Sequence, residues 1–331
     1  CSNPRFLGMQ GMHGHYASSM AQAEADLVIA AGARFSDRAT GNKDVYVRNC
    51  NIIHIDVDDA EIDKNVTSHL GLNGDVKEIL SKLNSMLKKQ QRPEWNAEIE
   101  KFKAEEAGMT AKSSAMTPYD IIDTVNKKMP DDAIIVTDVG QHQMWASQYL
   151  KLDATHRLVQ SGGLGTMGFG LPSAVGAQIG CPEKSVVSIS GDGGFQMNMQ
   201  ELATAVCQEL PLVNIVFNNN RLGMVRQMQE LFFKKRYTIT CLRYHKSCKG
   251  KCGTPGWVCP EYVPDFVKMA EAYGSKGYFV TSNDQLKDTI LEAREYAEKN
   301  KKPVIVECMV APDELVMPMI KGGASFEDIM L

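Results

Sequence analysis

The sequence predicts an α/β protein with two parallel-sheet domains, each with helices on both faces of its sheet. Three observations support this prediction. Short apolar runs recur along the chain, and segments with helical spacing separate them. These runs are continuously apolar and end in Gly, Asp or Asn, which is typical of parallel strands buried on both faces. The length of 331 residues suits two or three domains.

Composition and charge narrow the classes of protein that the chain can be. Apolar residues make up 44% and charged residues 23%, and 36 Lys and Arg against 40 Asp and Glu leave a net charge of −4. This near-balance gives no reason to expect nucleic acid or an anionic membrane as a partner. No apolar run approaches the roughly 18–20 residues of a membrane span, and no signal-peptide pattern opens the chain. Nine cysteines, five of them isolated, fit a reducing compartment, so we expect a cytoplasmic protein.

The first domain is predicted over residues 1–87. Residues 26–32 and 51–56 form apolar runs that end in a glycine and a carboxylate, as expected of two buried parallel strands. A helix with Asp75 as its N-cap is predicted to complete the domain. The domain is short for a doubly wound sheet and the chain opens at Cys1 without Met, so we expect its N-terminal part to be missing.

Residues 88–117 are rich in Lys, Glu and Gln and show little helical periodicity, which predicts a solvated connector. A second α/β series follows over residues 118–331, in which predicted strands and helices alternate. The predicted helices cover residues 118–125, 172–179 and 199–208, and the predicted strands cover residues 133–138, 157–161, 185–190, 212–217 and 303–310.

Two polar motifs at strand ends carry the most chemical information. The sequence GDGG around Asp192 ends one predicted strand, and the run NNN around Asn219 ends the next. A right-handed crossover makes the two strands parallel, so both motifs reach the edge of the sheet where open α/β sheets bind ligands. A carboxylate and an amide oxygen suit Mg²⁺, and Gly193 and Gly194 would let backbone N–H groups approach a diphosphate. Either motif alone would be an ordinary turn, but together they predict a site for Mg²⁺ and a diphosphate.

The pattern GDG, 24 residues and NN resembles the thiamine-diphosphate signature of a large enzyme superfamily. Six segments are similar, in order, to acetohydroxyacid synthase (acetolactate synthase) catalytic large subunits, and together they span nearly the whole chain. The resemblance implies a partial FAD-binding central domain followed by a thiamine-diphosphate domain. The six segments are GMHGHYA (11–17), GARFSDRATG (32–41), DVGQHQMWA (138–146), SGGLGTMGFGLPSAVGAQ (161–178), NNNRLGMVRQMQ (218–229) and VMPMIKGGA (316–324).

The resemblance implies that residues 118–331 bind thiamine diphosphate and Mg²⁺. The implied Mg²⁺ ligands are Asp192, Asn219 and the main-chain carbonyl of Arg221. The implied diphosphate contacts are Gln141, His142, Gly193 and Gly194. Gly165 and Met167 match positions that grip the aminopyrimidine, and Met167 also matches the apolar wedge that bends the cofactor. The positions implied for catalysis are Gly165, Met167, Met224 and Met228.

The resemblance also implies FAD in the first domain. The matching positions are Met12, His13, Gly32, Ala33, Arg34, Asp37, Arg38, Asp56, Val57, Gly74 and Asp75. Arg34 and Arg38 would neutralise the phosphates of a dinucleotide, and the carboxylate of Asp56 would suit a ribose or an adenine edge. Exposed loop charges without a ligand are the alternative for the same residues.

The chain departs from the family in two features that bear on its function. The family's N-terminal domain supplies a glutamate to the aminopyrimidine, and neither Glu201 nor Glu209 follows a motif suited to that role. Because the family's active site lies between that domain of one subunit and the diphosphate domain of another, we expect this chain to hold half a site and to be inactive alone. Met228 stands where the family usually carries Trp, near the pocket for the second 2-ketoacid, so the second substrate stays open.

A third departure is an insert over residues 241–259. Four of its nineteen residues are cysteines, Cys241, Cys248, Cys252 and Cys259, in the spacing C-x6-C-x3-C-x6-C. This is not a standard zinc or iron–sulfur pattern, although four thiolates could close a tetrahedral Zn²⁺ site. A basic surface loop with free thiols and a redox-sensitive pairing are the alternatives that stay open.

The function that the resemblance implies is acetolactate synthase. The reaction is the decarboxylation of pyruvate and its carboligation to a second 2-ketoacid, which gives 2-acetolactate or 2-aceto-2-hydroxybutyrate for valine, leucine and isoleucine biosynthesis. The resemblance implies a homodimer or tetramer and leaves a regulatory small subunit open. Two other functions stay open: a fragment that binds cofactor without turnover, and a nicotinamide-dependent dehydrogenase. The second rests on residues 163–168, which fit G-x-G-x-x-G, but it leaves GDGG and the Asn run unexplained.

Overall fold

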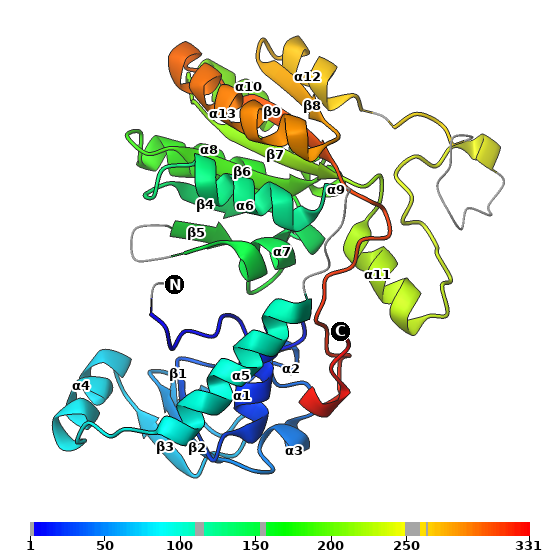
Figure 1. Ribbon diagram of the computed structural model, residues 1–331. Helices are drawn as coiled ribbons and strands as arrows, with labels where there is room; N and C mark the ends of the chain where they lie inside the picture. The colour runs from blue at the N-terminus through cyan, green and yellow to red at the C-terminus, as the bar shows by residue number, and fades with distance from the viewer. Residues whose placement is uncertain (1–2, 110–115, 153–156, 249–258, 263) are drawn as a thin grey trace. The chain divides into compact units, whose positions relative to one another are not determined.

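The computed structural model describes residues 3–331 except 110–115, 153–156, 249–258 and 263. Its contacts divide the chain into two compact units, which we call the smaller unit (Arg5–Lys112 and Val316–Leu331) and the larger unit (Cys1–Pro4 and Ser113–Leu315). Each unit has a parallel β-sheet of its own (Figure 1), so the predicted α/β class with two parallel sheets is confirmed. Among the described residues no helix has both the length and the apolar character needed to cross a lipid bilayer.

The sheet of the larger unit has six parallel strands in the order β5-β4-β6-β7-β9-β8. Strands β4, β6, β7 and β9 are buried along almost their whole length, as their continuous apolar runs predict. Strand β8 was not predicted, because this edge strand is only partly buried and begins with Lys and Gly. The bounds are β4 Ile134–Thr137, β5 Arg157–Gln160, β6 Val186–Gly191, β7 Val213–Asn218, β8 Lys276–Val280 and β9 Val304–Met309.

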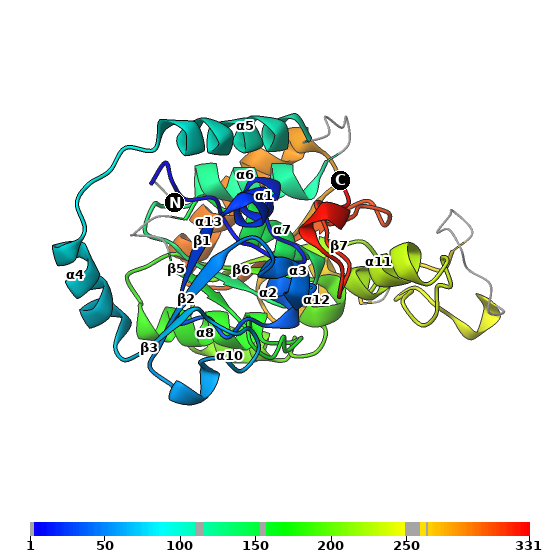
Figure 2. The ribbon, with the colours of Figure 1, turned by 90° about the horizontal axis from the view of Figure 1, so that it is seen from below.

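Helices cover both faces of this sheet (Figure 2). Helices α6, α7 and α13 lie on one face, and α8, α10 and α12 pack on the other, where Leu171, Leu202 and Phe266 fill a buried core. The predicted helices at α6, α8 and α10 are confirmed, whereas α7, α11, α12 and α13 were not predicted. The bounds are α6 Pro118–Lys128, α7 Gln141–Tyr149, α8 Gly170–Gly180, α9 Asp192–Phe195, α10 Glu201–Cys207, α11 Gly223–Phe232, α12 Phe266–Ala272 and α13 Asn283–Asn300.

The smaller unit has a three-stranded parallel sheet in the order β1-β2-β3. The two predicted strands are confirmed, and the third is a four-residue strand that contains a glycine and has too short a pattern to be predicted. Asp75 caps the next helix as predicted, because its side chain accepts a hydrogen bond from the backbone N–H of Glu78 (3.1 Å). The bounds are α1 Tyr16–Glu24, β1 Leu27–Ala31, α2 Asp37–Thr40, α3 Lys43–Tyr46, β2 Asn51–Asp56, β3 Leu70–Asn73 and α4 Val76–Met86.

The segment predicted as a connector contains a 17-residue helix, α5 (Pro93–Met109). Of its described residues only Phe102 is buried, so the helix has no apolar stripe that the sequence could reveal. Polar contacts hold it to α1 instead. The carboxylate of Glu106 accepts a hydrogen bond from the backbone N–H of Ala17 (3.3 Å) and contacts Nδ1 of His15 (2.8 Å). Contacts between residues so far apart in the chain leave no trace in local periodicity, which is why the helix was not predicted.

The last residues of the chain pack in the smaller unit. The backbone N–H of Ile320 donates to the carbonyl of Met12 (2.9 Å), and Ile320 and Phe326 join Phe35 in a buried core. The second domain predicted from the sequence extends to residue 331, whereas the contacts group Val316–Leu331 with the smaller unit. The physical reason is that the apolar side chains of this tail complete the core of the smaller unit.

Candidate functional site

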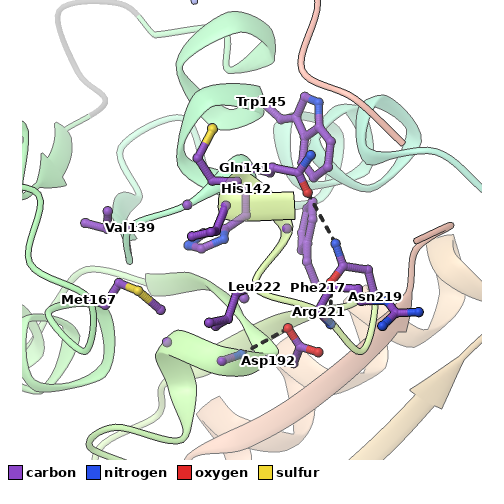
Figure 3. A pocket seen from close by; sticks show the side chains of 17 residues that line it. Val139, Gln141, His142, Trp145, Met167, Asp192, Phe217, Asn219, Arg221 and Leu222 are labelled. Atoms are coloured by element: carbon purple, nitrogen blue, oxygen red, sulfur yellow. Dashed lines mark hydrogen bonds between the residues drawn. The ribbon is translucent and has the colours of Figure 1, made fainter. Parts of the chain in front are cut away.

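A pocket lies at the carboxyl ends of β4, β6 and β7 in the larger unit (Figure 3). This is the edge of the sheet at which the sequence places the two strand-end motifs. Gly165 and Met228, which were also predicted to belong to the site, do not line this pocket. The predicted residues that do line it are Gln141, His142, Met167, Asp192, Gly193, Gly194, Asn219, Arg221 and Met224. The lining residues that were not predicted are Val139, Gly140, Trp145, Gly191, Phe217, Leu222, Gly223 and Val225.

Asp192 is a buried carboxylate in this pocket. The residue is 2% exposed, and its Oδ1 accepts a hydrogen bond from the backbone N–H of Gly193 (3.0 Å). Its Oδ2 has no hydrogen-bond partner among the described residues. Burial raises the pKa of Asp192 to about 8, although the backbone N–H groups of Gly193, Asn220 and Arg221 act in the opposite direction. A buried carboxylate with an unpaired oxygen is stabilised by a proton or by a cation.

The turn after β7 carries Asn219 into the same pocket. Oδ1 of Asn219 accepts a hydrogen bond from the backbone N–H of Arg221 (3.0 Å), and Nδ2 donates to Oε1 of Gln141 (3.2 Å). The structure therefore brings Asp192 and Asn219 to one pocket, but the amide of Asn219 contacts Gln141 and Arg221 rather than Asp192 (Figure 3). Oδ1 of Asn219 keeps a second lone pair that a cation could use.

Gln141 and His142 begin α7 and present uncharged polar groups. Nε2 of Gln141 donates to the carbonyl of Glu314 (2.9 Å) and to Oε1 of Gln227 (2.9 Å), which fixes its side chain. His142 is 5% exposed, and in the described part of the chain its Nε2 has no hydrogen-bond partner. Burial lowers the pKa of His142 more than the charge of Asp138 raises it, so the imidazole is neutral. One ring nitrogen of a neutral imidazole is a donor, which suits a phosphate oxygen.

Asp138, which the sequence analysis did not single out, organises the glycine-rich turn beside the pocket. Its carboxylate is buried and accepts hydrogen bonds from the backbone N–H groups of Val139 (2.7 Å), Gly168 (3.2 Å) and Gly170 (2.8 Å). Gly168 directly follows Met167, so these bonds anchor the backbone next to Met167, which lines the pocket. A signal was present in the sequence, because Asp138 ends a buried apolar strand in the same way as the Asp of GDGG.

Close packing explains the two glycines that follow Asp192. A Cβ at Gly194 would lie 2.2 Å from Oδ1 of Asp138, and a Cβ at Gly193 would lie 2.7 Å from the side chain of Leu222. The predicted reason for these glycines was the approach of a diphosphate to their backbone. Both line the pocket, and the structure adds that a Cβ at either position would force a neighbouring side chain to move.

One side of the pocket is an apolar wall that the sequence did not predict. The rings of Trp145 from α7 and Phe217 from β7 stack with centroids 6.3 Å apart and planes inclined by 27°. Leu222 and Val225 add aliphatic surface to the lining. The pocket therefore combines an apolar wall with a polar end at Asp192 and Asn219 (Figure 3).

Comparison with known proteins places this pocket in a family. Residues 138–308, which include every residue that lines the pocket, match the thiamine pyrophosphate enzyme C-terminal TPP binding domain. The chain belongs to the thiamine pyrophosphate enzyme family. Residues 1–83 match the thiamine pyrophosphate enzyme central domain of the same family.

Relatives within this family include acetolactate synthases. The chain is 38% identical over 326 residues to the acetolactate synthase large subunit of Porphyra purpurea, a match that covers 96% of this chain and 51% of the relative. It is 37% identical over 330 residues to the acetolactate synthase isozyme 3 large subunit of Escherichia coli K12, with 97% and 54% covered. The match to the acetolactate synthase of Mycobacterium leprae is 38% over 336 residues, with 99% and 51% covered. The chain thus spans about half the length of these relatives.

The groups in the pocket fit the cofactor of a thiamine pyrophosphate enzyme. The unpaired Oδ2 of Asp192 and the amide oxygen of Asn219 are the hard oxygen ligands that Mg²⁺ takes together with phosphate. Nε2 of the neutral His142 can donate to a phosphate oxygen in the tautomer that carries the proton on this nitrogen. The apolar wall of Trp145 and Phe217 suits the uncharged surface of an organic cofactor or substrate.

Three of the predicted flavin positions come together in the smaller unit. Met12, Asp37 and Arg38 line a small pocket with Lys321. The backbone N–H of Met12 donates to the carbonyl of Arg38 (2.8 Å), and Nη1 of Arg38 lies 3.6 Å from Sδ of Met12. Burial lowers the pKa of His13 to about 4, with a smaller effect in the same direction from the positive charge of Arg38.

The other predicted flavin positions do not line this pocket. Oδ1 of Asp56 accepts a hydrogen bond from the backbone N–H of Asp58 (2.9 Å), and Asp75 caps α4. The backbone N–H groups of Gly32 and Gly74 donate to the carbonyls at the end of β2. The flavin site therefore stays a prediction, in which the positions outside the pocket are His13, Gly32, Ala33, Arg34, Asp56, Val57, Gly74 and Asp75.

The described part of the cysteine-bearing insert contains free thiols. Cys241 and Cys248 are not in disulfides, and Cys252 lies outside the described residues. In the described ranges no group of three or more His, Cys, Asp or Glu side chains could hold a metal ion. The three alternatives for the insert, a zinc site, a basic loop and a redox-sensitive pairing, therefore stay open for the full set of four cysteines.

Proposed function

We propose that this chain is the cofactor-binding part of an acetolactate synthase, with thiamine diphosphate and Mg²⁺ in the pocket of the larger unit. The observation on which this proposal rests is the buried Oδ2 of Asp192, which has no partner among the described residues and lies in one pocket with Asn219. Membership of the thiamine pyrophosphate enzyme family and the 37–38% identity to acetolactate synthases support it.

In this proposal Asp192, Asn219 and the main-chain carbonyl of Arg221 hold the cation. Gln141, His142, Gly193 and Gly194 bind the diphosphate, His142 as a neutral donor and the glycines through their backbone. Met167 would contact the cofactor, and Asp138 fixes the turn that carries Met167, with Gly165 two residues before it. When bound, the cofactor supplies the carbon nucleophile and the electron sink for decarboxylation of a 2-ketoacid.

The proposed substrates are pyruvate and a second 2-ketoacid, and the proposed products are 2-acetolactate and 2-aceto-2-hydroxybutyrate. The wall of Trp145 and Phe217 excludes water from one side of the pocket, which favours loss of CO₂ from a charged carboxylate. Met224 lines the pocket and is the proposed substrate contact on α11, whereas Met228 lies outside the lining and is retained only by resemblance.

The remaining parts of the proposal concern the assembly. No glutamate lines the pocket as the structure describes it, and we propose that another polypeptide segment supplies the glutamate that a thiamine-diphosphate enzyme uses on the aminopyrimidine. We propose a homodimer or tetramer that completes the site, with FAD in the smaller unit, a regulatory small subunit as a further partner and a cytoplasmic location. The pathway would be the biosynthesis of valine, leucine and isoleucine.

The test is a binding and turnover experiment on the 331-residue chain. Thiamine diphosphate with Mg²⁺ should quench the fluorescence of Trp145 and bind with one-to-one stoichiometry in calorimetry. Pyruvate should then give acetolactate only when the N-terminal domain of an acetolactate synthase is added. Cofactor binding without acetolactate under both conditions would favour a cofactor-binding fragment, and absence of cofactor binding would overturn the proposal.

The dehydrogenase hypothesis is not favoured by the geometry. Residues 163–168 follow β5, which is an edge strand of the sheet, and of these six residues only Met167 lines the pocket. Gly168 is engaged by Asp138 through its backbone N–H, so this N–H is not available to a pyrophosphate. Reduction of a 2-ketoacid that depends on NADH would be the result that revives this hypothesis.

A further inference from the structure

The beginning of the cysteine-bearing insert pairs with the turn that follows β7. The backbone N–H of Leu222 donates to the carbonyl of Thr240 (2.9 Å), and the backbone N–H of Leu242 donates to the carbonyl of Asn220 (3.0 Å). Arg221 lies opposite Cys241 in this short antiparallel pair. The insert therefore holds both neighbours of Arg221, which is the residue whose carbonyl is the proposed cation ligand.

This pairing determines the direction of the backbone at Arg221. Successive residues of an extended chain point their N–H and C=O groups to opposite sides. Asn220 and Leu222 direct theirs to the insert, so Arg221 directs its own away from the insert. The backbone N–H of Arg221 accordingly faces Oδ1 of Asn219 (3.0 Å) and acts on the carboxylate of Asp192. In an extended residue the carbonyl points to the same side as the N–H, which for Arg221 is away from the insert.

Tyr262, which lies just after the insert, reaches the other side of the same site. Nε2 of Gln196 donates to the Tyr262 hydroxyl (2.5 Å) and also to the main-chain carbonyl of Asp192 (3.2 Å). The ring of Tyr262 packs on Phe266 of α12 with centroids 5.7 Å apart, which fixes its position against the core. The carboxylates of Asp192 and Glu307 act electrostatically on the phenol, which places the Tyr262 hydroxyl close to the Asp192 side chain.

We propose that Tyr262 is a positioning residue for the cation site: acting through Gln196, it holds the backbone of Asp192 in the orientation that cation binding needs. The inference rests on the proposed thiamine-diphosphate site. It adds that contacts with this site flank the cysteine-bearing insert on both sides, at the pairing of Thr240–Leu242 and at Tyr262, three residues after the insert ends. Partners outside the first ligand shell of a metal typically change its affinity by 10- to 100-fold when they are removed.

The experiment measures binding of Mn²⁺, as the probe cation, to the full chain in the presence of thiamine diphosphate by electron paramagnetic resonance. Tyr262→Phe is expected to weaken Mn²⁺ binding about tenfold. The matched control is Tyr244→Phe, a substitution at an exposed tyrosine of the insert, and it should leave the affinity unchanged. Gln196→Ala and the double variant complete the cycle. The loss of affinity in the double variant should be smaller than the product of the two single losses, because Tyr262 and Gln196 share a hydrogen bond.

The outcomes separate this inference from the function on which it rests. Wild-type affinity in Tyr262→Phe, or additive effects of the two substitutions, would overturn the role of Tyr262 while leaving the cofactor site intact. A parent chain that binds Mn²⁺ equally with and without thiamine diphosphate would overturn the proposed site itself. Melting temperatures of the unliganded variants are measured alongside. If Mn²⁺ affinity falls because the fold is less stable, these temperatures fall as well, whereas a positioning role leaves them within about 2 °C of the parent.

Discussion

The carboxylate of Asp138 accepts a hydrogen bond from the backbone N–H of Gly170 at 2.8 Å, across 32 positions of the chain. The bond joins the end of β4 to the first residue of α8, and its companion at Gly168 extends the link to the turn that carries Met167. Positioning of the cofactor pocket therefore depends on a carboxylate that does not itself line the pocket.

Replacing Asp138 by Asn should destabilise the larger unit. An amide can present only one oxygen, so at least one of the N–H groups of Gly168 and Gly170 would face an NH₂ group and lose its acceptor. The expected cost is about 1–3 kcal/mol in the free energy of unfolding, the range for a buried polar group left unpaired. Urea denaturation followed by circular dichroism measures it, with the exposed Asp288→Asn as control. Equal midpoints for both variants would contradict the role of Asp138.

Gly194→Ala should disrupt the same region from the opposite side. The new Cβ would lie 2.2 Å from Oδ1 of Asp138, so the carboxylate or α9 has to move. We expect a loss of about 2 kcal/mol or more in stability, as for overpacked cores, together with loss of cofactor binding. Gly163→Ala is the matched control, because a Cβ at Gly163 has no heavy atom within 4 Å. If Gly194→Ala binds thiamine diphosphate as tightly as Gly163→Ala does, the packing argument fails.

Asp192→Asn should separate cation binding from stability. The change removes the charged oxygen ligand. Loss of a partner beyond the first ligand shell weakens metal binding by up to roughly 100-fold, and loss of a ligand itself should weaken Mn²⁺ binding in the presence of thiamine diphosphate by more than this. The unliganded chain should be no less stable, because Oδ2 has no partner among the described residues and a buried charge is costly. Electron paramagnetic resonance and thermal denaturation give the two quantities. A marked fall in melting temperature with unchanged Mn²⁺ affinity would refute the ligand role.

His13 should make the smaller unit sensitive to acid. Its pKa is lowered from 6.5 to about 4 in the folded chain, whereas the unfolded chain takes up the proton near pH 6.5. Between these two values the unfolded state binds more protons, so stability falls as the pH is lowered from about 6.5 to about 4. The slope is at most about 1.4 kcal/mol per pH unit.

The measurement for His13 is the melting temperature as a function of pH. His13→Gln should flatten the decline between pH 6.5 and 4.5 relative to the parent chain. His245→Gln, at an exposed histidine of the larger unit, should leave it unchanged. Parallel curves for His13→Gln and the parent would show that protonation of His13 is not linked to unfolding.

Much of the pocket could be predicted because its side chains sit next to strong local signals. The runs that precede Asp192 and Asn219 are continuously apolar, and continuous burial on both faces is what a parallel sheet imposes. Polar residues that follow such runs reach the carboxyl edge of the sheet whatever the details of packing. The N-cap at Asp75 could be predicted equally well from the sequence, because a cap involves residues only a few positions apart.

Long-range contacts determine the parts of the fold and of the site that the sequence did not predict. The packing of α7, α8 and α11 determines three features of the site. These are the stacking of Trp145 on Phe217, the hydrogen bonds that Asp138 accepts from Gly168 and Gly170, and the position of Met228 outside the pocket. Helix α5 is the clearest case, since its contacts to α1 run through Glu106 and not through an apolar stripe. Local periodicity records burial along one element, whereas a hydrogen bond between distant residues exists only once both elements have been placed by the fold.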